Sequence, residues 1–128
     1  CEATVPKLAV IMRKAYGGAY IVMSSKHVGA DVNLAWPTAE VAVMGAAGAV
    51  EVLFRKEIMS AEDQEQATVE KVEEYETKFL NPARAMERGY VDAVISPSET
   101  RVKLYRHLKS HLSKAEESPE KRHGNIPT

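Results

Sequence analysis

Two adjacent glycines, Gly17 and Gly18, constrain this 128-residue chain more than any other feature. They lie between two short apolar runs, residues 8–12 and 21–23. The first run is typical of a strand buried on both faces, and paired glycines let the backbone turn sharply and approach a ligand closely. The pattern therefore predicts a strand, a glycine turn and the start of a helix. Free N–H groups at such a start can hold a developing negative charge without an ionisable side chain.

The rest of the chain alternates short apolar segments with amphipathic ones, which indicates an α/β architecture. Further strands are predicted at 32–36, 40–44 and 90–95. Asn81-Pro82 and the capping box of Ser96 to Glu99 are typical helix starts. Apolar stripes at helical spacing, including Val69, Val72, Tyr75 and Phe79, predict inward faces. Helices are accordingly expected at 19–25, 46–58, 61–80 and 82–89, and from 99 onward.

The bulk composition excludes several classes of protein. A formal net charge of −1 gives no general attraction to nucleic acid or to a membrane surface. The single cysteine, Cys1, excludes an internal disulfide and a cysteine-built metal site, and is compatible with a reducing compartment. No apolar run approaches the roughly 20 residues that span a bilayer. The start at Cys1, without an initiator methionine, makes us expect that the chain begins inside a larger fold.

The turn from Gly17 to Ala19 is the leading candidate site. Its position after a buried strand is where open α/β sheets bind ligands, although a plain strand-to-helix connection would show the same tripeptide. It is not a nucleotide loop, because neither G-x-x-x-x-G-K-[ST] nor G-x-G-x-x-G is present. The flanking Tyr16 and Tyr20 would either line a pocket for a flat ring or pack in the core.

Other polar residues have plainer interpretations. His107 and His111 share one helix face but have no third ligand nearby, so we expect an exposed polar face and no metal site. Glu40 is either a paired, buried carboxylate or a strand-edge residue. The acidic run at 70–76 is interleaved with lysine and is typical of a solvated helix face.

Several motifs follow one another along the chain. They are Arg-Lys-Ala-Tyr-Gly-Gly-Ala-Tyr (13–20), Ala-Trp-Pro-Thr-Ala-Glu-Val-Ala-Val-Met-Gly-Ala (35–46), Gly-Ala-Val-Glu (48–51), Phe-Arg-Lys-Glu-Ile (54–58), Asn-Pro (81–82), Arg-Gly-Tyr-Val-Asp (88–92), Pro-Ser-Glu-Thr-Arg (97–101) and Lys-Arg-His-Gly-Asn-Ile-Pro (121–127). In this order they resemble the motifs of one family, the carboxyltransferase subunit of biotin-dependent acyl-CoA carboxylases. That group includes the propionyl-CoA carboxylase beta chain, the large transcarboxylase subunit and the methylmalonyl-CoA decarboxylase alpha chain. The resemblance covers nearly the whole chain and the C-terminal quarter of such a subunit.

The resemblance implies a crotonase-like (ClpP-like) α/β fold, a superhelix of ββα units. Residues 1–115 would be the second half of the C-terminal carboxyltransferase domain, a partial domain, and 116–128 a polar tail. The family's active site forms between the N-terminal domain of one subunit and the C-terminal domain of another. A homo-oligomer, from dimer to hexamer, is therefore expected, and this chain alone should be inactive because the acyl-CoA half-site is absent.

The resemblance also implies roles for the glycine turn. The backbone N–H groups of Gly18 and Ala19 would form an oxyanion hole facing the biotin carbonyl. Tyr16, Gly17, Tyr20 and Ile21 would bind substrate or biotin, and no metal is implied. Propionyl-CoA carboxylases often have aspartate where this chain has Ile21, a position that influences acyl-chain preference in the family. Acetyl-CoA or a mixed preference is therefore open.

The implied function is carboxyl transfer between carboxybiotin and a short-chain acyl-CoA, propionyl-CoA or acetyl-CoA. Biotin would be carried on a separate protein or domain, with coenzyme A as part of the substrate. The implied partners are a biotin carboxyl carrier protein and biotin carboxylase, without nucleic acid or direct membrane insertion, in the cytoplasm or the mitochondrial matrix. Two alternatives are a methylmalonyl-CoA decarboxylase alpha subunit in a sodium-pumping complex and, in another class, a non-catalytic assembly module.

Overall fold

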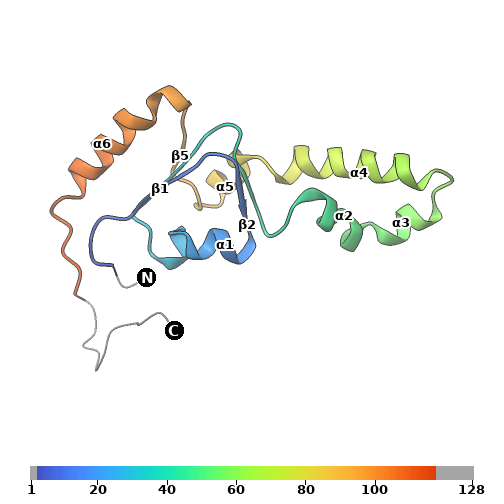
Figure 1. Ribbon diagram of the computed structural model, residues 1–128, viewed down its shortest axis with the longest axis horizontal. Helices are drawn as coiled ribbons and strands as arrows, with labels where there is room; N and C mark the ends of the chain where they lie inside the picture. Colours follow the sequence, from blue (N-terminus) through green and yellow to red (C-terminus); the bar gives the residue numbers. More distant parts are fainter. Residues whose placement is uncertain (1–2, 118–128) are drawn as a thin grey trace.

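Two small parallel sheets organise the computed structural model, which describes residues 3–117 (Figure 1). The larger sheet has the order β1-β3-β5, formed by Leu8–Ile11, Val32–Ala35 and Ala93–Val94. The smaller sheet pairs β2 (Lys14–Tyr16) with β4 (Glu40–Ala42). All three pairings are parallel, and helical segments lie in the chain between the two strands of each pair. The described residues therefore confirm the α/β prediction.

The central strand β3 is buried along its whole length, which explains why three of its four residues are apolar. On one side, Val32, Leu34 and Ile95 form a cluster that Trp36 and Leu104 cover in part. The other cluster contains several alanines, whose small side chains let neighbouring segments approach closely. It consists of Ile11, Ala15, Ala35, Ala39, Ala85 and Val91, with Tyr20 and Val41 packed against it.

The helices lie around this core and beyond it. The short helix α1 (Gly17–Val22) and the 3₁₀ turn η1 (Lys26–Val28) connect β2 to β3. In Figure 1 three helices extend away from the sheets as an arm, and the chain returns through α5 (Pro82–Glu87). The arm consists of α2 (Ala46–Leu53), α3 (Arg55–Ser60) and α4 (Gln64–Phe79). The 3₁₀ turn η2 (Pro97–Glu99) and α6 (Thr100–Ser110) follow β5.

Two helix starts form as the sequence predicts. The Asn81 side chain accepts a hydrogen bond from Arg84 N at 3.1 Å, with Pro82 at the first helical position. In the second start, the Glu99 carboxylate accepts from Ser96 N at 2.9 Å, which completes the capping box. These local signals set where α5 and η2 begin, and so position the residues between them.

Three sequence expectations differ from the structure. Residues 14–16, for which no strand was predicted, form β2, because they pair with β4 although only Ala15 is buried. The helix expected over 46–58 is broken at Phe54, where φ is −112° and ψ is 12°. No residue of the predicted inward stripe of α4 is fully buried, and Val69 is 53% exposed. Within residues 3–117, no helix has the length and apolar character needed to cross a membrane.

Candidate functional site

The glycine turn joins β2 to α1 in a conformation that requires glycine. Gly17 has φ of +56°, in the left-handed region that L side chains rarely adopt. A Cβ atom built there would lie 2.9 Å from the carbonyl oxygen of Val43, which is closer than real Cβ contacts allow. The segment after β4 therefore fixes the turn from one side, and only glycine fits between them.

The next two amides belong to the first turn of α1, where N–H groups have no acceptor within the helix. Within residues 3–117, neither Gly18 N nor Ala19 N donates a hydrogen bond to another group of the protein. Both residues are exposed, and a Cβ at Gly18 would meet nothing within 4 Å. Two adjacent main-chain donors are thus available to a ligand.

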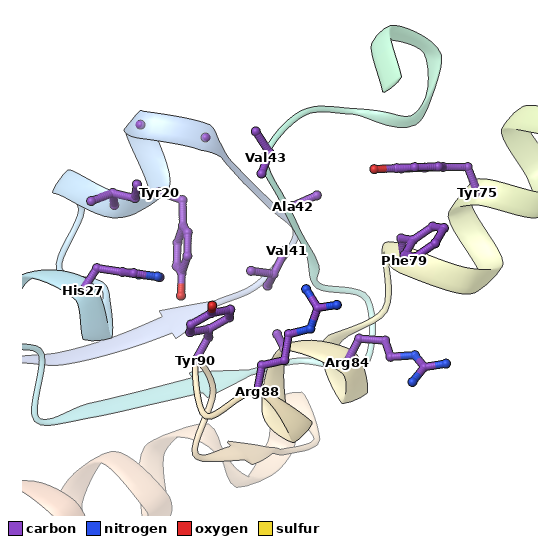
Figure 2. Close-up of a pocket in the computed structure, with 14 residues that line it drawn as sticks. Tyr20, His27, Val41, Ala42, Val43, Tyr75, Phe79, Arg84, Arg88 and Tyr90 are labelled. Atoms are coloured by element: carbon purple, nitrogen blue, oxygen red, sulfur yellow. The ribbon is translucent and has the colours of Figure 1, made fainter. Parts of the chain in front are cut away.

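A pocket of about 640 Å³ opens beside this turn (Figure 2), within the size range of small-molecule sites. The glycine turn forms one edge, and the end of α4 and α5 form the opposite side. The wall consists of Gly17, Gly18, Tyr20, Ile21, His27, Val41, Ala42, Val43, Tyr75, Phe79, Arg84, Ala85, Arg88 and Tyr90.

Three aromatic rings lie along one wall of the pocket. The His27 ring lies 4.8 Å from that of Tyr90 and 6.1 Å, edge-on, from that of Tyr20 (Figure 2). His27 Nδ1 is 3.3 Å from Ser25 Oγ, which itself donates to the carbonyl of Ile21 at 3.0 Å. Burial raises the pKa of Tyr20, so its hydroxyl stays protonated near neutral pH. Such walls suit a flat, weakly polar ring.

Tyr16 does not line this pocket. Its hydroxyl donates a hydrogen bond to the Glu40 carboxylate, so Glu40 is a paired carboxylate. Burial, and then the bond to Glu40, raise the pKa of Tyr16 to about 12. Its ring also lies against Gly45, where an added Cβ would be 3.4 Å from Tyr16 Cε2. Tyr16 therefore joins β2 to β4 directly behind the glycine turn.

We expect Tyr16→Phe to lower the free energy of unfolding by about 1–3 kcal/mol at pH 8, because Glu40 loses a donor. The wild-type phenol has a folded pKa of about 12 against an ordinary 10, so this contribution is complete below pH 10. It is lost as the pH rises from 10 towards 12, and the difference between the two proteins should then narrow. Urea unfolding at pH 8 and pH 11 measures this, and an equal difference at both values contradicts it.

The structure also adds residues that the sequence did not single out as a site. His27, Tyr90 and Arg88 lie in the wall. Two of them, Arg88 and Tyr90, belong to the Arg-Gly-Tyr-Val-Asp motif. Residues 3–117 contain no group of three or more histidine, cysteine, aspartate or glutamate side chains that could hold a metal ion. Cys1 and most of the expected tail, 118–128, lie outside the described residues.

Comparison with known proteins identifies the family. Residues 1–126 match the carboxyl transferase domain family, and the chain belongs to it. The chain is 56% identical over 126 residues to the propionyl-CoA carboxylase carboxyltransferase subunit of Haloferax mediterranei. It is 55% identical over 126 residues to methylmalonyl-CoA decarboxylase subunit alpha of Propionigenium modestum. It spans 24% of the length of each of these relatives.

A solved structure gives the same assignment for the fold. The transcarboxylase 12S hexamer, crystallised with methylmalonyl-coenzyme A and methylmalonic acid, matches 99% of this chain with a TM-score of 0.91 at 50% identity. The chain covers 24% of that protein. Together these matches confirm the family resemblance and the crotonase-like α/β fold of a partial carboxyltransferase domain.

Proposed function

We propose that this chain supplies the biotin-binding part of the active site in a biotin-dependent acyl-CoA carboxyltransferase. The observation that carries the proposal is the pair of free amides at Gly18 and Ala19, at the edge of a pocket with aromatic walls. The reaction moves a carboxyl group between carboxybiotin, held on a carrier protein, and the α-carbon of propionyl-CoA or acetyl-CoA.

The chemistry requires oxyanion stabilisation. As the carboxyl group leaves N1′ of carboxybiotin, negative charge develops on the ureido oxygen. The carboxyl carbon bonds to the α-carbon of the acyl-CoA, and the proton lost from that carbon ends on N1′. Two preorganised N–H donors stabilise the ureido oxyanion with little reorganisation, and removing one such donor typically costs about 3 kcal/mol in the transition state.

The other residues of the turn have separate tasks in this proposal. Gly17 supplies the left-handed backbone that aims the two amides. Tyr20 and Ile21 form the wall against which the biotin rings pack. Tyr16, bonded to Glu40, supports the turn from behind.

The proposal includes partners for the complete protein. Biotin arrives on a separate carrier that a biotin carboxylase loads, and the acyl-CoA binds to a half-site outside this chain. Subunits would assemble so that the two half-sites meet. The hexameric assembly of the related transcarboxylase 12S supports this arrangement.

The test uses a complete subunit that contains this chain, incubated with a carboxylated biotin carrier and propionyl-CoA. We expect methylmalonyl-CoA to form, detected by mass spectrometry, and its formation to stop when avidin binds the biotin. A folded, oligomeric subunit that leaves propionyl-CoA and acetyl-CoA unchanged would contradict the proposed function and would favour a non-catalytic assembly module.

A second candidate is the alpha subunit of a methylmalonyl-CoA decarboxylase. The 55% identity to the Propionigenium modestum protein favours it. It uses the same chemistry in the opposite direction, with the carboxyl group moving from the acyl-CoA to biotin. Copurification with a biotin carboxylase indicates the first function, and copurification with a membrane-bound decarboxylase indicates the second.

Ile21, in the pocket wall and 38% exposed, provides a test of acyl-chain selectivity. We expect Ile21→Asp to raise the preference for propionyl-CoA over acetyl-CoA by roughly tenfold, the scale on which one methylene is discriminated. The ratio of kcat/KM values for the two substrates measures this. Val22→Asp is the matched control, because Val22 is 75% exposed and outside the wall. An unchanged ratio in Ile21→Asp would exclude Ile21 from selectivity.

A further inference from the structure

The pocket wall has an unbalanced charge. Among residues 3–117, its ionisable side chains include Arg84, Arg88 and His27, and no aspartate or glutamate lines it. The free amides of the glycine turn add partial positive charge at one edge. A cavity of this character attracts an anionic group rather than a neutral ring alone.

The two arginines are not equivalent. Arg84 Nη1 lies 3.0 Å from Glu87 Oε2, so a carboxylate of its own helix already compensates that charge. Arg88 forms no ion pair or side-chain hydrogen bond with any other described residue. Figure 2 shows Arg88 extending towards Val41 and Ala42, whereas the guanidinium of Arg84 points away from them. Arg88 therefore supplies the uncompensated positive charge of the cavity.

We propose that Arg88 binds the carboxylate that is being transferred, an inference that rests on the proposed function. A guanidinium presents parallel N–H donors that match the two oxygens of a carboxylate. The amides of Gly18 and Ala19 hold the ureido oxygen, which leaves the carboxylate as the second anionic group needing a partner. Each group then has its own donor set.

The charge of the transferred group explains why one arginine serves both directions. The carboxylate carries a single negative charge on N1′ of carboxybiotin and again on the α-carbon of the product. Arg88 takes part in no bond-breaking step. It stabilises the carboxylated forms of both substrates relative to the uncarboxylated forms, and it orients the carboxyl carbon towards its acceptor.

The test compares two ligands that differ only in the carboxylate. Dissociation constants of methylmalonyl-CoA and propionyl-CoA are measured by titration calorimetry on the complete subunit and on its Arg88→Met variant. We expect Arg88→Met to weaken methylmalonyl-CoA binding tenfold or more, the scale of one charged hydrogen-bonding partner. Propionyl-CoA binding should change by less than about twofold, and Arg88→Lys, which keeps the charge without the paired donors, should be intermediate.

The two ligands share the phosphates of coenzyme A, so a phosphate-binding role for Arg88 would weaken both equally and overturn the inference. An equal loss through distortion of the pocket, or no change in either constant, would overturn it too. Arg101→Met is the charge-matched control, because Arg101 lies on α6 outside the pocket and is exposed.

Turnover separates this inference from the function on which it rests. A wild-type subunit that transfers carboxyl groups, with a ratio of dissociation constants unaffected by Arg88→Met, refutes only the role of Arg88. The converse result is a wild-type subunit that transfers no carboxyl group while Arg88→Met still changes the ratio of the methylmalonyl-CoA and propionyl-CoA dissociation constants. That result refutes only the proposed function.

Discussion

Replacing Ala19 with proline is expected to abolish carboxyl transfer in the complete subunit while the subunit still folds and assembles. Proline has no N–H group, so one of the two proposed oxyanion donors disappears. The position lies in the first turn of α1, where proline removes no hydrogen bond within the described residues. The loss of one donor predicts a fall in kcat of at least about 100-fold. Transfer from a carboxylated carrier, measured with propionyl-CoA, checks this value.

The control for this experiment is Ala19→Gly, which keeps the N–H group and removes only a methyl. It should retain most of the wild-type kcat. Size-exclusion chromatography and thermal unfolding establish that Ala19→Pro is assembled and folded. Normal turnover by a folded Ala19→Pro subunit would remove the oxyanion role from this amide.

Gly17→Ala is expected to cause the second large effect, through strain rather than through loss of a donor. The left-handed backbone costs an L residue about 1–2 kcal/mol. In addition, the new Cβ would approach the Val43 carbonyl oxygen to 2.9 Å, so one of the two segments must move. Both donors of the adjacent residues then shift together. We expect the free energy of unfolding to fall by about 1–3 kcal/mol and kcat by at least about tenfold.

Gly18→Ala distinguishes the effect of backbone strain from the effect of a side chain that fills the ligand side of the same turn. An added Cβ at Gly18 meets nothing within 4 Å, so this variant should keep wild-type stability. The open space at this Cβ indicates that a valine there would act by occupying the ligand side of the turn. Urea unfolding of both variants provides the measurement, and equal stabilities of Gly17→Ala and Gly18→Ala would contradict the strain argument.

The sequence predicted the fold well where signals are local. The apolar run that becomes β1, the cap at Asn81 and the capping box at Ser96 depend on neighbours within a few residues, and each is present in the structure. Strand β2 was missed because its three residues are stabilised by pairing with β4, more than twenty positions away. No pattern within residues 13–16 reports that partner.

The candidate site was likewise predictable from the sequence only where the signals are local. The glycine turn was identifiable because two adjacent glycines follow an apolar run in the sequence. The aromatic wall was not, because His27 and Tyr90 come from distant segments that meet only after β3 and β5 pair. The free positive charge of Arg88 was likewise hidden, since only the structure shows that Glu87 bonds to Arg84 and not to Arg88.

The proposed donors at positions 18 and 19 are main-chain atoms, and this determines which substitutions could weaken the binding of an inhibitor. A compound anchored through its oxygen to those two amides would depend little on side-chain chemistry at the contact. Most single substitutions at Ala19 would leave the N–H in place. Resistance to the inhibitor would therefore have to come from substitutions in the surrounding wall, or from substitutions that also lower kcat. Under this proposal, a substitution that removes one of the two donors would also remove a group that turnover requires.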